Sequence, residues 1–430
     1  MSDRSRRLRV NALARVEGEG ALRVVISGDT VERAELAIYE PPRFFEAFLR
    51  DRAHTEPPDI TARICGICPV AYQVSACNAI EQVCDVALDP PLAALRRLLY
   101  CGEWISSHTL HIHLLHLPDF LGYPDAIALA AEHRELVEHG LAVKKAGNAI
   151  LELIGGRPIH PINVRVGGFY STPAPADLVP ITEQLSRARD YAIDTARHLA
   201  GLEFPDSDLD HHLVALTQPD RYAIEGGDVH TTTGLTFPAD QFCEHVVEHQ
   251  VAHSTALHAR LDGDRYLTGP LARYSLNSEH LSPLARQVAT DVGLGPQCRN
   301  PFRSILVRAV EVVYALDEAL RLIADYERPA RPAVPVAPRA GIGHGVSEAP
   351  RGLLYHRYEL DEAGIIRAAA IIAPTSQNQS VIEDDLRRVT QANLVLDDAE
   401  LIRLCEHTIR NYDPCISCAA HFLELERIHL

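Results

Sequence analysis

The sequence of 430 residues lacks the features that mark nucleic-acid-binding, membrane-spanning and secreted proteins. Its net charge is −17 and no basic stripe offsets the acidic residues, so a nucleic-acid partner is not expected. No segment approaches the roughly 18 uncharged apolar residues that a membrane span needs. No apolar stretch follows the arginines of residues 4–9, as it would in a secretory signal. We therefore expect a cytoplasmic protein without a membrane span.

The sequence also lacks the common motifs for nucleotides and iron–sulfur clusters. No Gly-x-Gly-x-x-Gly follows a predicted strand, and the turn at residues 225–228 is not followed by the Gly-Lys-Ser/Thr of a phosphate loop. The ten cysteines form no dense run of the kind that holds an iron–sulfur cluster. Neither a dinucleotide nor such a cluster is expected on this chain.

Hydrophobic periodicity predicts a mainly α fold with small β elements, in the α+β class. Five long helical segments are expected, at residues 69–86, 91–116, 125–154, 176–203 and 301–327. Shorter elements are expected too: β-hairpins at residues 20–40 and 353–373, a helix at 43–52, and two helices before the last cysteines. Because 47% of the residues are hydrophobic, we expect a core of bundled long helices with the hairpins at its periphery.

Residues 328–345 differ in character from the helical segments. Proline recurs there at every third position, which favours an extended polyproline-II run, and three alternating glycines follow at residues 341–345. This stretch could be a flexible linker or a rigid backbone that passes a buried site. The chain is predicted to form one domain. Its expected parts are an N-terminal hairpin and helix (1–60), a helical core (61–327) and a C-terminal metal-binding segment (328–421).

Four of the cysteines form two Cys-x-x-Cys pairs, one near each end of the chain. Cys65 and Cys68 form the first pair, and Cys415 and Cys418 form the second. The pairs can meet only if the fold brings the chain ends together, and four thiolates at one point make a soft-metal site. Pro69 suits the first turn of a helix, so Cys68 is expected at a helix N-terminus, where the helix dipole favours a thiolate.

Structural zinc is the first candidate for such a site. Paired zinc ligands usually lie about 15–20 residues apart, however, and here nearly the whole chain separates the pairs. Charged residues, Arg63 and Asp413, flank the pairs, and His421 adds a possible ligand three residues after Cys418. A catalytic, redox-active centre is therefore the second candidate.

The remaining cysteines and a group of histidines have simpler interpretations. Six single cysteines are expected to be buried free thiols: Cys77, Cys84, Cys101, Cys243, Cys298 and Cys405. Four histidines share one predicted helix and could form a ligand cluster, although core or interface histidines are the stronger expectation: His108, His111, His113 and His116.

Four motifs in one order resemble the signatures of nickel–iron hydrogenase large subunits. They are Arg-Val-Glu-Gly at 15–18, Arg-Ile-Cys-Gly-Ile-Cys-Pro at 63–69, Ala-Pro-Arg-Gly at 349–352 and Asp-Pro-Cys-Ile-Ser-Cys-Ala-Ala-His at 413–421. The resemblance spans essentially the whole chain. The form of residues 39–46 and 413–418 is most similar to the cytoplasmic, NAD(P)-linked branch, also called sulfhydrogenases.

The resemblance implies a nickel–iron centre whose iron carries carbon monoxide and cyanide. Cys65 and Cys415 would be terminal ligands of nickel, while Cys68 and Cys418 would bridge nickel to iron. Heterolytic cleavage of H2 needs a metal that accepts hydride and a nearby base that accepts the proton. Cys415 is the implied base, and Glu17 would pass the proton outward.

Further residues would surround that centre. Arg351 would lie over its open side as a fixed positive charge, oriented by Asp413. The backbone at Pro350 and the hydroxyl of Thr375 would bond to the cyanides. Many respiratory members have an aspartate near the position of Ser107, so the network above the metals should differ in this chain.

A separate magnesium site is implied as well. Its ligands would be Glu46, His421 and a backbone carbonyl near Ile371, and the site would tie the C-terminus to the core.

Partner proteins follow from the same resemblance. An iron–sulfur small subunit would take the electrons, and further diaphorase subunits would carry FAD and NAD(P). A maturation endopeptidase would cut after His421 and remove residues 422–430. A related subunit of respiratory complex I lacks the cysteine pairs, which argues against that identity. The function predicted is reversible H2 cleavage; the alternative is a non-catalytic scaffold with a structural four-cysteine zinc site.

Overall fold

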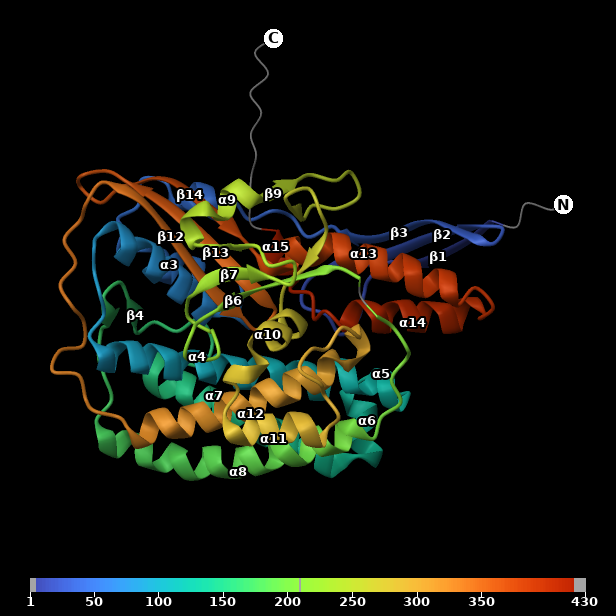
Figure 1. Cartoon of the computed structure of the whole chain (residues 1–430), viewed down its shortest axis with the longest axis horizontal. Coiled ribbons are helices and arrows are strands. Elements are labelled where there is room, and N and C mark those ends of the chain that lie inside the picture. Colours follow the sequence, from blue (N-terminus) through green and yellow to red (C-terminus); the bar gives the residue numbers. More distant parts are fainter. Residues whose placement is uncertain (1–4, 209, 421–430) are drawn as a thin grey trace, which may run out of the picture.

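The computed structural model describes residues 5–208 and 210–420. Its elements place the protein in the α+β class, with long helices and several small sheets. Four long helices lie side by side and form the lower layer of the molecule in Figure 1. They are α4 (Pro90–Leu110), α7 (Arg134–Gly155), α8 (Pro175–Ala200) and α12 (Ser304–Ala324). Most residues of α4 and α12 are buried, because these helices have neighbours on several sides.

A three-stranded antiparallel sheet packs against the helix that follows the first cysteine pair. The sheet has the order β12-β13-β14, and α3 packs against β12 and β13. These elements are α3 (Pro69–Val83), β12 (Gly341–Ala349), β13 (Gly352–Leu360) and β14 (Ile366–Ile372). The alternating glycines after the proline run therefore belong to a strand, and the predicted hairpin at 353–373 gains a third strand.

The N-terminal sheet and the C-terminal helices pack together on the other side of the molecule (Figure 1). The sheet has the order β1-β2-β3, and α13 packs against β3. Its strands are β1 (Ser5–Val10), β2 (Gly20–Ser27) and β3 (Thr30–Ile38). The helices are α13 (Pro374–Ala392), α14 (Asp398–Arg410) and the single turn α15 (Ile416–Ala419). Strands β2 and β3 match the predicted hairpin, whereas β1 was not predicted.

The segment between α8 and α12 forms small sheets and short helices. A four-stranded sheet has the order β11-β6-β7-β8, and β9 pairs with β10 as a two-stranded ribbon. These strands are β6 (His212–Thr217), β7 (Asp228–Thr231), β8 (Thr236–Phe237), β9 (Val246–His249), β10 (His258–Leu261) and β11 (Tyr266–Leu267). The short helices of this segment are α9 (Phe242–His245), α10 (Pro270–Asn277) and α11 (Pro283–Asp291). Four short elements precede α8: α1 (Phe45–Leu49), α2 (Pro57–Thr61), β4 (Val164–Arg165) and β5 (Gly168–Phe169).

Two predicted helices are interrupted. The predicted helix at 125–154 is α6 (Ala126–Glu132) followed by α7, because His133 leaves the helical conformation between them. The predicted helix at 91–116 is α4, which continues as a π-helix (His111–His116) and then α5 (Leu117–Leu121). The widened turn precedes Pro118, which has no N–H with which to continue the α-helical ladder. In the described part of the chain, no helix is both long and apolar enough to cross a membrane.

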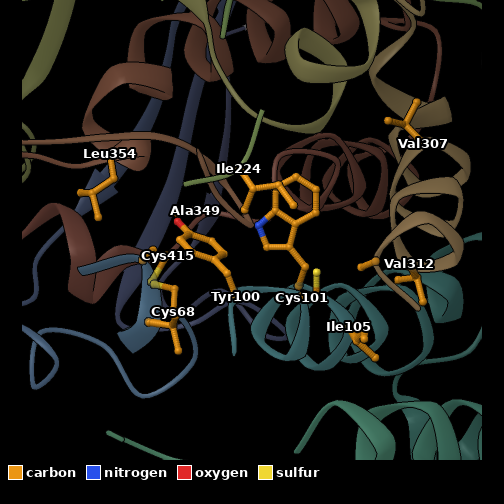
Figure 2. Close-up of a cluster of buried hydrophobic side chains, with 14 of the residues drawn as sticks. Cys68, Tyr100, Cys101, Ile105, Ile224, Val307, Val312, Ala349, Leu354 and Cys415 are labelled. Atoms are coloured by element: carbon orange, nitrogen blue, oxygen red, sulfur yellow. The ribbon is translucent and has the colours of Figure 1, made fainter. Parts of the chain in front are cut away.

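One large hydrophobic cluster joins these layers. It contains side chains from the N-terminal sheet, the long helices and all four paired cysteines. Figure 2 shows Cys68 and Cys415 among its apolar side chains, near Tyr100. Strand β12 reaches this cluster by packing its backbone directly on α3: a Cβ atom at Gly345 would overlap the carbonyl oxygen of Ser75.

The close approach of β12 to α3 predicts the effect of a single methyl group. Gly345→Ala should lower the free energy of unfolding by about 1–3 kcal/mol, because the added Cβ must push the strand away from the helix backbone. Gly226→Ala is the matched control, since nothing lies within 4 Å of a Cβ at that position. Chemical denaturation of both variants measures the difference. Equal stability of the two variants would contradict the packing described.

Candidate metal centre

The four paired cysteines converge on one point, as their positions at the two ends of the chain predicted. Their sulfur atoms all lie within 4.8 Å of one another, and each cysteine is only 1–2% exposed. The Sγ–Sγ distances are 3.3 Å for Cys65–Cys415, 3.4 Å for Cys68–Cys418 and 2.7 Å for Cys415–Cys418. Cys68 caps the N-terminus of α3 and Pro69 occupies its first turn, as expected.

The second cysteine pair is shaped by an unusual backbone. Asp413 has a positive φ of 49°, a conformation that turns the chain sharply between α14 and α15. Cys415 then pairs with Glu17 as an isolated parallel β-bridge, in which the N–H of Ile416 donates to the carbonyl of Glu17 at 3.0 Å. The C-terminal pair is thereby fixed to the segment that precedes β2.

Arg43 links the two cysteine motifs through their backbones. Its guanidinium donates to the carbonyl of Ile64, just before the first pair, and to the carbonyl of Ser417, inside the second pair, both at 2.6 Å. The sequence placed Arg43 in a family motif but gave no sign of this contact, because both acceptors are backbone atoms far away in the chain.

Glu17 lies directly against one of the sulfurs. Its Oε2 atom is 3.2 Å from the Sγ of Cys415, and it also accepts a hydrogen bond of 3.0 Å from the N–H of Ser417. Burial raises the pKa of the Glu17 carboxyl above its ordinary value, and the negative charge of Cys65 raises it further. This carboxyl can therefore hold a proton next to Cys415.

Arg351 supplies the positive charge beside the sulfurs. It is 2% exposed, donates to the carboxylate of Asp413 at 3.0 Å and to its carbonyl at 2.9 Å, and reaches the hydroxyl of Ser107 at 3.3 Å. Although burial lowers it, the negative charges of Asp413 and the sulfurs hold the pKa of Arg351 well above its usual value. The predicted orientation of Arg351 by Asp413 is present, and Ser107 takes part in the same network.

The pKa values of the cysteine thiols depend on the neighbouring thiols and on Arg351. The pKa of the Cys65 thiol lies well below its ordinary value, because hydrogen bonds from Cys415, Cys418 and Cys68 stabilise its thiolate and Arg351 adds positive charge. Burial raises the pKa of Cys415. A cation placed among the sulfurs would stabilise all four as thiolates.

Thr375 and Pro350 lie at the same centre but offer different chemistry. The hydroxyl of Thr375 accepts from the N–H of Cys415 at 3.0 Å, which leaves its own hydrogen to donate elsewhere. Pro350 has no backbone N–H, and its carbonyl accepts from Arg273 at 2.9 Å. Because an anionic ligand needs a donor, the backbone of Pro350 cannot bond a cyanide through its own amide.

Two residues near the centre were missed by the sequence analysis. Arg273 is fully buried between Glu311 and Glu348 and donates to the carbonyls of Ala349 and Pro350. It therefore positions the segment that carries Arg351. No motif contains Arg273, so only the fold reveals it.

Glu103 is the other missed residue. Its carboxylate accepts from the N–H groups of Val70 and Ala71 at the N-terminus of α3, next to Cys68, at 2.6 and 3.1 Å. Burial raises the pKa of Glu103 well above its usual value. The helix start predicted at Pro69 implied unsatisfied N–H groups, but not which side chain would accept from them.

The predicted magnesium ligands lie partly outside the described residues, because His421 falls beyond residue 420. Of the other two, Glu46 accepts from the N–H of Ile371 at 2.7 Å. Glu46 and Ile371 are thus brought together, whereas the ligand role of an Ile371 carbonyl stays a prediction.

The four histidines of the predicted cluster are buried and have other partners. His108 lies 3.0 Å from the carboxylate of Glu311, and His111 bonds the carbonyl of Arg410 at 2.8 Å. Within the described ranges, none of the four belongs to a group that could hold a metal ion.

All six single cysteines are free thiols, but Cys243 is exposed and Cys84 partly exposed, so the expectation that all six are buried was wrong. Cys243 lies on the short surface helix α9, which has only one buried residue.

Comparison with known proteins identifies the family. The sequence matches nickel-dependent hydrogenases over residues 43–142 and 220–421. The chain belongs to this family. It is 32% identical to sulfhydrogenase 1 subunit alpha of Pyrococcus furiosus over 97% of this chain and 98% of that one. It is 26% identical to NAD-reducing hydrogenase HoxS subunit beta of Cupriavidus necator, over 97% and 95% of the two chains.

A solved structure has the same fold. A chain of an NAD+-reducing [NiFe]-hydrogenase in the H2-reduced state aligns with a TM-score of 0.87 and 26% identity, covering 97% of this chain and 99% of that one. Membership of a hydrogenase family does not favour the alternative of a non-catalytic zinc scaffold.

The residues present fit the metal that the family uses. Four thiolates make a soft donor set of the kind that nickel accepts, and the buried guanidinium of Arg351 compensates their negative charge. One carboxylate oxygen of Asp413 has no hydrogen-bond partner within the described chain, so the polar network beside the sulfurs has room for a further donor.

The convergence of the sulfurs predicts which cysteines retain metal. Cys68→Ser should reduce the nickel content of the purified protein by at least tenfold, because the hard hydroxyl is a poor replacement for a thiolate. Cys243→Ser, at the exposed thiol, should retain nickel at the parent level. Elemental analysis of both variants provides the measurement, and equal nickel in the two would contradict the assignment.

Proposed function

We propose that the chain is the catalytic subunit of a nickel–iron hydrogenase that interconverts H2 with protons and electrons and exchanges the electrons with NAD(P) through partner subunits. The observation that carries this proposal is the contact of 3.2 Å between the Glu17 carboxylate and the Cys415 sulfur, inside a cluster of four buried cysteines. This contact offers a path for a proton from the Cys415 sulfur to the Glu17 carboxylate.

Cys65, Cys68, Cys415 and Cys418 would hold the centre. A nickel–iron centre whose iron carries carbon monoxide and cyanide supplies the heterolytic cleavage of H2. The protein's own part is to accept the proton at the Cys415 sulfur and to pass it to Glu17. The raised pKa of Glu17 lets its carboxyl hold that proton until it rotates away from the sulfur.

The surrounding residues position the donors and exclude water. Arg351 keeps a fixed positive charge at the sulfurs, and Asp413 holds its orientation through two hydrogen bonds. The hydroxyl of Thr375 would donate to a cyanide, because its oxygen already accepts from the N–H of Cys415. Burial of all four cysteines limits side reactions with water.

Partner subunits are required because the sequence has no motif for electron carriers. We infer an iron–sulfur small subunit and further subunits with FAD and NAD(P), in a cytoplasmic complex. The similarity to a sulfhydrogenase subunit alpha and to a subunit of an NAD-reducing hydrogenase supports this inference. A magnesium ion at Glu46, cleavage after His421 by a maturation endopeptidase, and folding of the chain as one domain complete the proposal. The shared hydrophobic cluster supports the single domain.

Removal of the acidic proton at position 17 tests the proton route. Glu17→Gln should lower H2 turnover and hydrogen–deuterium exchange by at least about 100-fold, because an amide cannot relay a proton from Cys415. The nickel content should stay at the parent level. Gas-phase mass spectrometry of isotope exchange measures the effect.

Glu19→Gln provides the control, because Glu19 lies on the same segment but is exposed. It should retain parent activity. Full exchange activity in Glu17→Gln would contradict the role of Glu17.

A further inference from the structure

A second group of metal-ligating side chains lies outside the four-cysteine centre. It consists of His253, His258 and Glu383, and one ligand atom of each lies within 4.8 Å of the other two. In residues 5–208 and 210–420 no other group besides the cysteines reaches this density of histidine, cysteine and carboxylate. The three residues come from the β9–β10 ribbon and from α13, and α13 packs against both β10 and β3. The hydrogenase reaction uses none of them.

His258 has a ring nitrogen, Nε2, that is available to ligate a metal ion. It is 3% exposed, and its Nδ1 atom lies 3.4 Å from the hydroxyl oxygen of Ser380. Its Nε2 atom is buried and has no hydrogen-bond partner in the part of the chain that the structure describes. A hydrogen on Nδ1, shared with Ser380, leaves a lone pair on Nε2. A buried ring nitrogen without a partner is unfavourable unless something else occupies that position.

His253 and Glu383 supply the other two donors. The Nε2 atom of His253 lies 2.7 Å from a carboxylate oxygen of Glu383, and both side chains are mostly buried. On the other side of the same ring, Nδ1 lies 3.9 Å from a carboxylate oxygen of Glu35 on β3. A carboxylate behind a ligating histidine fixes the orientation of the ring and strengthens its donor nitrogen.

The His258 ring is in the neutral form that a metal ligand requires. Burial, together with the neighbouring His253, His249 and Arg260, lowers the pKa of His258 to about 3, so its ring is neutral at physiological pH. Burial also raises the pKa of Glu383. A metal ion binds a neutral imidazole together with a carboxylate. The positive charge of the ion would stabilise the ionised carboxylate of Glu383.

We propose that His253, His258 and Glu383 bind one divalent transition-metal ion of borderline softness, such as zinc. Two imidazoles and one carboxylate form a donor set that zinc accepts, with the fourth position open to water or to His249. His249 pairs directly with His258 across the ribbon and its ring centre is 5.9 Å away, yet its side chain is exposed. Glu35 is a positioning residue for His253.

The ion would fix the ribbon to α13, which also packs against β3 of the N-terminal sheet. The ribbon's connecting loop already contacts the end of β3, where the N–H of Thr255 donates to the carbonyl of Ile38 at 2.8 Å. Two residues further on, the carboxylate of Glu40 accepts from the hydroxyl of Ser417 between the second pair of cysteines. An ion held by β9–β10 and α13 therefore stabilises the segment that leads to the cysteine centre.

Cobalt and zinc titrations of the full-length chain, dialysed against chelator, test the proposal. The expected result is one equivalent of cobalt with nitrogen and oxygen ligation, counted apart from any cobalt at the four cysteines. Cobalt at the cysteines produces an intense thiolate-to-cobalt absorption, whereas cobalt at the histidines does not, so the two sites are distinguished. In His258→Gln, zinc competition should show affinity at this site reduced by more than about 100-fold, and in Glu35→Gln by about 10–100-fold.

Two further variants keep the test decisive. His253→Gln removes a less buried ligand and should give the same loss as His258→Gln, even if the latter folds poorly. His245→Gln is the control, because His245 ends α9 just before the ribbon but pairs with Asp262. It should bind as the parent does. Parent protein that binds no ion outside the cysteines, or unchanged affinity in both His258→Gln and His253→Gln, would overturn the proposal.

Discussion

Negative charge buried where the two ends of the chain meet is the constraint on which the rest of the structure depends. Four sulfurs, nearly free of solvent, lie close enough to share one metal centre. Thiolates in such a place are unfavourable without compensating charge, and an unpaired buried charge costs about 3–5 kcal/mol. The protein meets this constraint with the positive charge of Arg351, while Arg43 joins the backbones of both cysteine motifs.

Arg351 keeps its place because a second buried network lies behind it. Arg273 is held between Glu311 and Glu348, stacks on Trp104 with its guanidinium 4.4 Å from the ring centre, and donates to the carbonyls just before Arg351. This network connects α10, α12 and β12, which are far apart in the sequence. The helical layer is therefore more than a support, since it determines where the positive charge at the centre lies.

The sequence predicted the centre better than it predicted the framework around it. The cysteine pairs, the cap at Cys68, and the partners Glu17, Arg351 and Asp413 are specified by short motifs, so their juxtaposition could be expected. Strand β12 could not be recognised, because its alternating glycines have low strand propensity and are explained only by close packing on α3.

Contacts between residues far apart in the sequence could not be predicted, for a different reason. Glu103 and Arg273 act on backbone groups that no local pattern connects with them. His253 and His258 lie in the ribbon and Glu383 lies in α13, and only the packing of α13 on the ribbon brings the three together. Periodicity describes which face of an element is buried, but it does not say which buried polar groups will meet.

The infrared spectrum of the purified native complex, in the region of carbon monoxide and cyanide stretching, tests the central claim most directly. If the four sulfurs hold a nickel–iron centre, bands from both ligands should be present, and they should shift when the complex is reduced with H2. A preparation active in H2 turnover that shows no such bands, or one in which the four sulfurs hold only zinc, would contradict the account.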